Sequence, residues 1–155
     1  KLLEISPRAN VICAFSLSPE EIIKSLEHQA PSLNARLSAA KKLQLAGWPV
    51  ALRLDPIILI KDFKAHYESF FEQITEKLDL KTLHSITIGA FRLPKRFFKT
   101  VKNLYPEEPL FAGKFNSDNG QVSYEKSTEK NLLDWCEEKL GSYNDCPPVY
   151  RQTLK

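Results

Sequence analysis

The chain has 155 residues, with 22 lysines and arginines, 19 aspartates and glutamates and a formal net charge of +3. Hydrophobic residues make up 43% and charged residues 26%, which fits one globular domain and excludes disordered, collagen-like and coiled-coil chains. No apolar run approaches the roughly 20 residues that cross a bilayer, and the N-terminus lacks the basic flank of an export signal. We therefore expect no membrane partner, and the near balance of charges indicates no other partner by itself.

The chain begins at Lys1 and contains no methionine, which predicts a piece of a longer polypeptide. Its three cysteines, Cys13, Cys136 and Cys146, form neither a close-set ligand cluster nor an even disulfide set. This usage is typical of a reducing compartment, so we predict a cytoplasmic protein. Cys13 lies in an apolar run and is expected to be a buried small hydrophobic residue.

The first half of the chain alternates strand-like and helix-like segments. Ser18 and Ser32 are predicted to cap two helices, with Pro19 at the first helical position of one and Gly47 ending the other. The apolar run of the first strand predicts burial on both faces, as in a parallel sheet. In chain order we expect a strand over residues 10–17, helices over 19–27 and 33–46, a strand over 49–54 and a helix over 62–78.

The second half repeats this alternation and adds a hairpin. Asn119-Gly120 is a strong hairpin-turn signal between two short apolar segments. We expect a strand over residues 85–91, a helix over 95–104, hairpin strands over 110–115 and 121–124, a helix over 128–140 and a strand over 149–154. The fold class predicted is α/β, with a mostly parallel sheet, right-handed crossovers and a β-hairpin insertion.

In folds of this kind, chemistry collects at the C-terminal ends of the strands. Four polar residues stand at these ends: Ser16, Ser18, Asp55 and Arg92. Two hydroxyls, a carboxylate and a guanidinium suit a ribose, an amino group and an anionic substrate. The same residue types also serve as helix caps and turn formers, and Arg92 also fits a solvated turn, so both interpretations stay open. Phosphate-binding glycine loops, zinc-ligand spacings and nucleophile elbows are absent from the sequence.

The predicted helix over residues 95–104 carries Lys95, Arg96, Lys99 and Lys102 with phenylalanines between them. This pattern indicates either contact with nucleic-acid phosphates or a solvated face over an aromatic core stripe, and the second interpretation is the simpler one. Glu27 and an arginine at position 36 are expected to pair across the break between the first two helices.

These residues resemble a known family, the spore photoproduct lyases and their relatives among the radical S-adenosylmethionine (SAM) enzymes. The similarity is to the C-terminal half of these enzymes and covers nearly the whole chain. It is most specific between Phe15 and Ile58, and it includes Phe15-Ser16-Leu17-Ser18-Pro19-Glu20-Glu21, Glu27-His28-Gln29-Ala30-Pro31-Ser32-Leu33, Ala46-Gly47-Trp48-Pro49-Val50, Asp55-Pro56-Ile57-Ile58 and Ile88-Gly89-Ala90-Phe91-Arg92-Leu93-Pro94.

The resemblance implies one half of a partial TIM-type barrel, here residues 1–155, together with SAM and a four-iron four-sulfur cluster. It implies that Ser16 and Asp55 bind SAM and that Arg92 faces the substrate, while no residue of this chain is catalytic or binds metal. The three-cysteine cluster motif of the family belongs to its N-terminal half, which would be this chain's partner. The implied activity is reversal of a thymine photoproduct in DNA, started by a 5′-deoxyadenosyl radical.

Two functional hypotheses follow. The first is the C-terminal half of a radical SAM lyase, inactive when isolated, with DNA as a candidate substrate. The alternative is a non-catalytic α/β module that binds a protein or a nucleic acid through the basic helix and the hairpin. A half-barrel has unpaired strand edges, so we also predict poor solubility or self-association of the isolated chain.

Overall fold

The structure is a computed structural model that describes residues 1–27 and 29–152. Its main sheet has four parallel strands in the order β1-β2-β3-β7, and a second sheet has three antiparallel strands in the order β4-β6-β5. The strands are β1 (Cys13–Ser16), β2 (Val50–Ile57), β3 (Leu83–Ala90), β4 (Arg92–Pro94), β5 (Asn116–Asp118), β6 (Gln121–Ser123) and β7 (Val149–Arg151). The α-helices are α1 (Glu20–Leu26), α2 (Leu33–Leu45), α3 (Phe63–Lys77), α4 (Lys95–Leu104) and α5 (Lys126–Gly141), with 3-10 turns η1 (Leu2–Glu4), η2 (Leu80–Thr82) and η3 (Pro109–Ala112).

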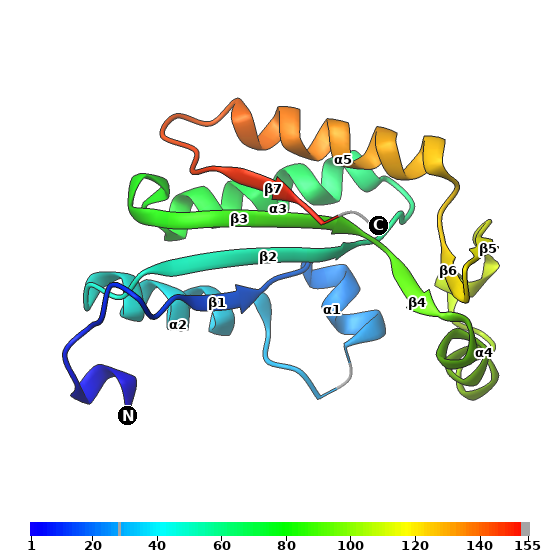
Figure 1. Cartoon of the computed structure of the whole chain (residues 1–155), viewed down its shortest axis with the longest axis horizontal. Coiled ribbons are helices and arrows are strands. Elements are labelled where there is room, and N and C mark those ends of the chain that lie inside the picture. Colours follow the sequence, from blue (N-terminus) through cyan, green and yellow to red (C-terminus); the bar gives the residue numbers. More distant parts are fainter. Residues whose placement is uncertain (28, 153–155) are drawn as a thin grey trace.

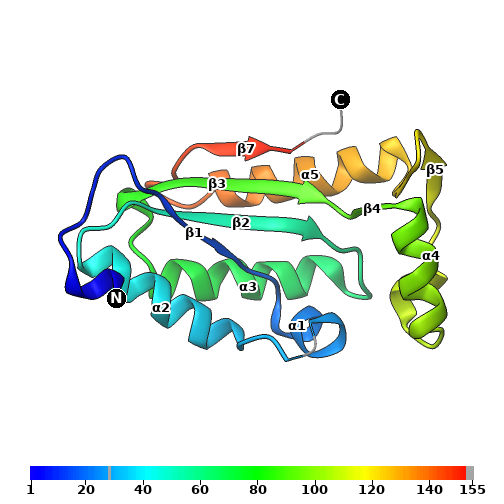
Figure 2. The same cartoon turned by 60° about the horizontal axis from the view of Figure 1, so that its bottom comes forward.

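Helices cover one face of the main sheet. Helices α2, α3 and α5 lie side by side behind the strands, and both views show them on the same side (Figures 1 and 2). The core fills the space between the sheet and these helices, because alternate strand residues point towards them. Its largest fully buried side chains include Leu52, Leu54, Ile86 and Ile88 from the strands and Tyr67, Phe70, Phe71 and Ile74 from α3.

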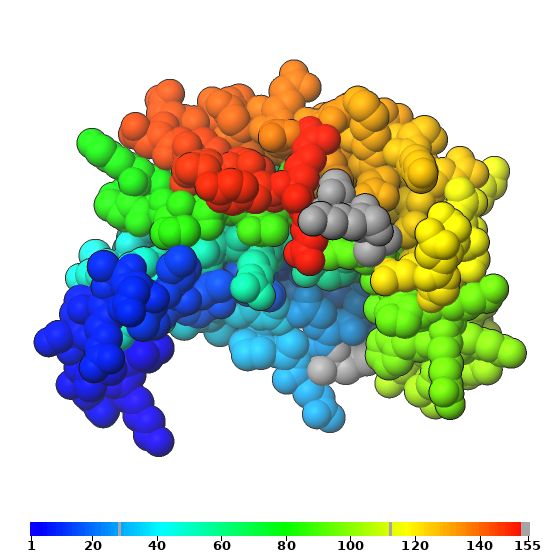
Figure 3. Space-filling model, in the orientation of Figure 1, coloured from blue at the N-terminus to red at the C-terminus, as the bar shows by residue number. Residues whose placement is uncertain are grey.

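The opposite face of the main sheet is open and polar. Ser16, Arg53, Thr87 and Tyr150 are paired in register across the four strands, so their side chains share this face. Ser16, Arg53 and Tyr150 are exposed and Thr87 is half-buried, whereas Leu52 and Leu54 on the covered face are 0% and 1% exposed. Figure 3 shows this face from the front, with strand residues at the surface.

Helix α4 and the second sheet lie beyond the C-terminal ends of the main strands. All four main strands point towards them in Figure 1. Phe98 of α4 joins Phe91, Phe111, Phe115 and Tyr124, which come from η3 and from the segments beside the strands, in an aromatic cluster whose neighbouring ring centroids are 5.3 to 6.3 Å apart. Phe91 and Tyr124 belong to the main hydrophobic core, and Phe98 and Phe115 pack against it, so the cluster attaches α4 to one end of that core.

The predicted helix ends are partly confirmed. The hydroxyl of Ser32 accepts a hydrogen bond from the Ala35 N–H at 3.3 Å, as a cap does, and Gly47 has a positive φ of 82° after α2. Ser18 is not a cap, because α1 begins after Pro19 and the Ser18 hydroxyl instead donates to Glu27 at 2.7 Å.

The first predicted strand is shorter and less buried than expected. β1 covers only Cys13–Ser16, and its residues alternate between half-buried and exposed. The prediction of burial on both faces is wrong because β1 is an edge strand whose second face is uncovered, and Cys13 is accordingly only half-buried. β2 extends through Asp55 and Pro56, which were expected to end it.

The hairpin is confirmed around Asn119-Gly120, whose φ angles are 47° and 75°. Its strands differ from the prediction. The first expected strand is replaced by the 3-10 turn η3, and Asn116–Asp118 forms β5 instead. β4, which was expected to be a plain connection, pairs with β6. The final strand is confirmed as Val149–Arg151, and the expected residues 153 and 154 lie outside the described residues.

Among the described residues, no helix is long and apolar enough to cross a membrane.

The arrangement of strands and helices agrees with the predicted α/β class and with the half of a TIM-type barrel that the resemblance implies. β1 and β7 form the two edges of the main sheet, and the prediction of poor solubility or self-association stays a prediction.

Candidate functional site

A cavity of about 420 Å³ opens at the C-terminal ends of β1 and β2, which is within the size range of small-ligand sites. Its polar lining comes from three serines and three carboxylates, Ser16, Ser18, Ser25, Glu27, Asp55 and Glu108. The apolar side chains that share the lining include Ile22 of α1, Leu93 of β4, Phe97 and Val101 of α4 and Phe111 of η3, together with Ile58 and Phe91. Hydroxyls and carboxylates combined with apolar side chains suit a nucleoside, which has a polar ribose and a flat base.

Asp55 and Arg92 form an ion pair beside this cavity. Arg92 Nη2 donates to Asp55 Oδ2 at 2.7 Å and Arg92 Nη1 donates to Asp55 Oδ1 at 3.1 Å. The two side chains are only 19% and 17% exposed. Nη1 also donates to the Ala90 carbonyl at 2.9 Å, which anchors the guanidinium to the end of β3. Such a two-point pair fixes the orientation of the carboxylate.

Gly89 makes room for this pair. A Cβ atom at position 89 would lie 2.8 Å from Asp55 Cγ and 2.9 Å from Arg92 Nη1, closer than real Cβ atoms come to other atoms. Gly89 is itself buried in β3. The ion pair therefore depends on the absence of a side chain at this position.

A second polar network holds the end of β1. Arg36 on α2 donates to the carbonyls of Ser16 at 3.2 Å and Pro31 at 2.9 Å, and it forms an ion pair with Glu27. Glu27 in turn accepts the Ser18 hydroxyl. The expected pairing of Glu27 with Arg36 is thus confirmed, and through Arg36 it also reaches the backbone of Ser16. The Ser16 hydroxyl forms no hydrogen bond with another described residue and is free to contact a ligand.

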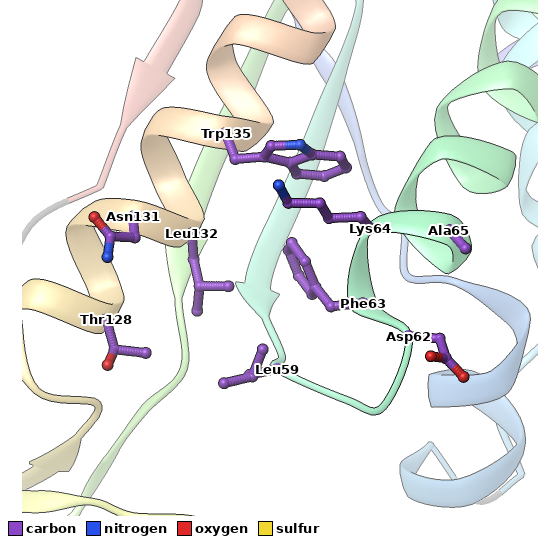
Figure 4. A pocket seen from close by; sticks show the side chains of 9 residues that line it. All are labelled: Leu59, Asp62, Phe63, Lys64, Ala65, Thr128, Asn131, Leu132 and Trp135. Carbon is purple, nitrogen blue, oxygen red and sulfur yellow. The ribbon is translucent and has the colours of Figure 1, made fainter.

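A second hollow of about 600 Å³ lies on the helix-covered side, between the start of α3 and α5. Figure 4 shows Phe63, Leu132 and Trp135 around it, with the Lys64 ammonium 5.9 Å from the Trp135 ring centroid. The residues predicted from the strand ends are not among those that line it. We therefore place the candidate site in the cavity at the strand ends.

The cysteines do not fit an iron–sulfur cluster. Within residues 1–27 and 29–152, no three His, Cys, Asp or Glu side chains are grouped as metal ligands. Cys136 is buried in α5, where desolvation raises the pKa of its thiol to about 12, and desolvation also raises the pKa of Cys146. A thiol with a raised pKa is a poor source of the thiolate that such clusters need. The described part of the chain thus offers no place for the cluster.

Sequence reasoning found the strand ends but not all of the contacts between them. The structure brings Ser16, Ser18 and Asp55 to one cavity and joins Asp55 to Arg92. The role of Gly89 was missed, and so was the contact of Arg36 with the Ser16 carbonyl, although the pairing of Arg36 with Glu27 was expected. Gly89 stands in the quoted family motif, yet only the neighbouring strand shows why a side chain is excluded there.

Comparison with known proteins identifies related sequences. The sequence model of the family described as spore photoproduct lyase matches residues 1–130. The spore photoproduct lyase of Bacillus subtilis is 24% identical over 144 residues, covering 92% of this chain and 38% of that enzyme. The enzyme of Clostridium acetobutylicum is 26% identical over 152 residues, covering 92% of this chain and 44% of the relative. The chain thus spans about two fifths of the length of these curated relatives.

Solved structures share the fold. A cysteine-to-alanine mutant of spore photoproduct lyase superposes with a TM-score of 0.80 and 21% identity, covering 91% of this chain and 44% of that chain. Spore photoproduct lyase complexed with dinucleoside spore photoproduct gives a TM-score of 0.76 at 21% identity, covering 91% and 44%. A double mutant with bound AdoMet, which is SAM, and dinucleoside spore photoproduct gives 0.74 at 20% identity, covering 93% and 44%.

Proposed function

Because this chain belongs to the spore photoproduct lyase family, we propose that residues 1–155 form the C-terminal part of a radical SAM enzyme and orient both SAM and the substrate. The observation that carries the proposal is the cavity at the strand ends, which is lined by Ser16 and Asp55 together with apolar side chains of β4, α4 and η3. The share of the relatives that the chain covers, and the solved relatives that hold AdoMet and dinucleoside spore photoproduct, support it.

In this proposal Ser16 and Asp55 hold the ribose of SAM. The Ser16 hydroxyl can donate and accept a hydrogen bond, and each Asp55 oxygen keeps a lone pair beyond its bond to Arg92. The apolar side chains that line the cavity pack against the base and exclude water. SAM supplies a 5′-deoxyadenosyl radical when bound in enzymes of this family, and an iron–sulfur cluster would be held by a polypeptide segment outside the 155 residues.

Arg92 acts at the border between the two ligands. Its guanidinium orients the Asp55 carboxylate, and the bonds to Asp55 and to the Ala90 carbonyl together use three of its five N–H donors. The Nε–H and the second hydrogen of Nη2 are left for an anionic group of the substrate, which we propose to be a DNA photolesion. A change in either bound ligand, SAM or the substrate, is therefore expected to affect the same ion pair between Asp55 and Arg92. We further propose that the protein works in the cytoplasm, because Cys13, Cys136 and Cys146 are all free thiols.

The test uses the polypeptide that includes the cluster-binding segment, prepared anaerobically with reconstituted cluster, dithionite and SAM. The expected result for the unmodified protein is formation of 5′-deoxyadenosine, which is measured by chromatography. Ser16→Ala removes one hydrogen bond and is expected to raise the Kd for SAM about 2- to 10-fold. Ser69→Ala is the matched control, because Ser69 is exposed on α3 on the other side of the sheet.

The outcomes separate the claims. If the unmodified protein forms a cluster but neither binds nor cleaves SAM, the proposed enzyme function is wrong and the non-catalytic module takes its place. If SAM is cleaved but Ser16→Ala binds it as tightly as Ser69→Ala does, the function stands and the assignment of Ser16 is wrong.

A further inference from the structure

Arg53 on β2 is a cation without a counter-ion in the described part of the chain. The lysine, arginine, aspartate and glutamate residues of the main sheet are Arg53, Asp55 and Arg151. Asp55 forms its ion pair with Arg92, and Arg151 forms ion pairs with two carboxylates of α5. The Arg53 side chain is exposed and forms no hydrogen bond or ion pair with any described residue. Among these three charges, only that of Arg53 is therefore left uncompensated.

Arg53 lies on the open face of the main sheet beside two residues of the candidate site. It is paired in register with Ser16 on β1, and Asp55 follows it two residues later on β2, which places all three side chains on the same face. With neighbouring strands about 4.8 Å apart and a rise of about 3.3 Å per residue, the Arg53 backbone lies about 5 Å from that of Ser16 and about 7 Å from that of Asp55. A ligand that contacts Ser16 and Asp55 therefore comes within reach of the Arg53 side chain.

The position of Arg53 favours a bound anion. The helices cover the other face of the sheet, so the open face corresponds to the inside of a TIM-type barrel. Inside a complete barrel the guanidinium would lose most of its contact with water, and a cation removed from water without a partner destabilises the protein strongly. Arginine binds carboxylates and phosphates through two parallel hydrogen bonds, so a group of this kind is the expected partner.

SAM has one anionic group, and this group is a carboxylate. The sulfonium and the ammonium of SAM are positive, whereas the carboxylate of its methionine part is negative. In the proposed function Ser16 and Asp55 hold the ribose, and the methionine part is attached to the 5′ carbon of that ribose. Asp55 would repel the SAM carboxylate, and Arg92 already pairs with Asp55. Arg53 has the opposite charge to this carboxylate and lies beside both of the residues that hold the ribose.

We propose that Arg53 binds the carboxylate of the methionine part of SAM and thereby selects SAM over adenosine derivatives that lack this group. The inference rests on the proposed function for the identity of the ligand. It adds a specificity-determining residue that acts on the methionine part, whereas Ser16 and Asp55 act on the ribose. The competing explanation is a carboxylate of another polypeptide segment that faces Arg53, and it predicts no dependence on the carboxylate of the ligand.

The test compares SAM with decarboxylated SAM, which keeps the sulfonium and the ammonium but has no carboxylate. Isothermal titration calorimetry measures the Kd of each ligand for the polypeptide used in the SAM assay. Arg53→Gln removes the charge, and Arg53→Lys keeps the charge without the two-point geometry. Arg96→Gln is the matched control, because it removes the same charge from an exposed residue of α4 beyond the strand ends.

The deciding quantity is the Kd for decarboxylated SAM divided by the Kd for SAM. Arg53→Gln is expected to raise the Kd for SAM about 10- to 100-fold and that for decarboxylated SAM less than about 3-fold, because only SAM loses a charge-assisted hydrogen-bonded pair. Arg53→Lys is expected to give an intermediate ratio, and Arg96→Gln to keep the ratio within about 2-fold of that of the unmodified protein, since exposed distant charges are screened. Contributions from polypeptide outside the 155 residues are the same in all of these proteins and cancel when the ratios are compared.

Equal weakening of SAM and decarboxylated SAM by Arg53→Gln would overturn the proposal, because Arg53 would then act on the fold or on another part of the ligand. An unchanged Kd for SAM would overturn it too. Ligand binding requires no turnover, so the two proposals fail separately. SAM cleavage with an unchanged ratio in Arg53→Gln keeps the proposed function and rejects this inference, whereas a ratio that depends on Arg53 without SAM cleavage keeps this inference and rejects the radical reaction.

Discussion

Arg92 is joined to Asp55 across 37 residues of sequence by two hydrogen bonds of 2.7 and 3.1 Å. Asp55 belongs to the main sheet, and Arg92 begins the first strand of the second sheet. The pair therefore connects the two sheets at the edge of the cavity. It also links the residue expected to contact SAM to the residue expected to face the substrate.

We expect Asp55→Ala and Arg92→Ala each to lower the free energy of unfolding by about 2 kcal/mol, because each leaves a largely buried charge without its partner. The double variant is expected to lose less than the sum of the two, with a coupling of at least about 1 kcal/mol. Urea denaturation of the four proteins measures the cycle. Additive losses would show that the pair does not stabilise the fold.

Gly89→Ala tests the space in which this pair forms. The new Cβ would lie 2.8 Å from Asp55 Cγ and 2.9 Å from Asp55 Oδ2, so the strand or the ion pair has to shift. We expect a loss of about 1 to 3 kcal/mol in stability and weaker SAM binding. Gly141→Ala is the control, because nothing lies within 4 Å of its added Cβ and alanine is the better helix former. Equal effects of the two changes would contradict the assigned role of Gly89.

The sequence was sufficient for the order of most strands and helices and for the edge of the sheet where the site lies. Apolar runs separated by helix signals indicate a parallel sheet, and such sheets bring the ends of their strands together. That rule alone placed Ser16 and Asp55 at one cavity. It does not say that Asp55 and Arg92 meet, because the contact depends on where β4, a strand of the second sheet, begins relative to the end of β2.

The errors have identifiable physical causes. The segment before the hairpin looked like a strand because of its apolar residues, but Phe111 and Phe115 pack into the aromatic cluster around Phe91, and residues 109–112 form a 3-10 turn with no strand between it and Asn116. Tertiary packing overrode strand propensity there. The apolar run at β1 similarly predicted burial without revealing that one face of the main sheet stays open.

Arg36 provides a prediction about positioning rather than contact. Its guanidinium binds two carbonyls and the Glu27 carboxylate at once, and lysine cannot reproduce that geometry. We expect Arg36→Lys to raise the Kd for SAM about 3- to 10-fold by loosening the end of β1 at Ser16. Arg8→Lys is the control, since Arg8 is exposed and its side chain contacts no acid in the described residues.

The measurement is SAM binding to Ser16→Ala, Arg36→Lys and the double variant. If Arg36 acts through Ser16, the double variant is expected to bind SAM no more than about 2-fold more weakly than the weaker single variant. Multiplied effects would indicate that Arg36 influences SAM binding by another route.

Two tyrosines hold the loop that follows β2. The Ile58 N–H donates to the Tyr67 hydroxyl oxygen and the Leu59 N–H donates to the Tyr124 hydroxyl oxygen, both at 2.9 Å. Ile58 lines the cavity, so these bonds fix one side of the site. Burial raises the pKa of both hydroxyls, and that of Tyr67 rises far above its usual range.

Tyr67→Phe is therefore expected to have an effect that depends on pH. Near pH 7 it leaves the buried Ile58 N–H without its acceptor and lowers the free energy of unfolding by about 1 to 3 kcal/mol. A raised pKa in the folded state means that the contribution of Tyr67 is complete below the unfolded pKa of about 10 and is lost as the pH rises above it. Above about pH 10 the free energy of unfolding of the unmodified protein falls by up to about 1.4 kcal/mol per pH unit through this residue, and that of the variant does not.

The difference in free energy of unfolding between the unmodified protein and Tyr67→Phe should thus narrow from about pH 7 to about pH 11. Urea denaturation at both pH values, with the exposed Tyr150→Phe as control, measures it. A difference that stays constant would show that Tyr67 ionises equally easily in the folded and unfolded chains.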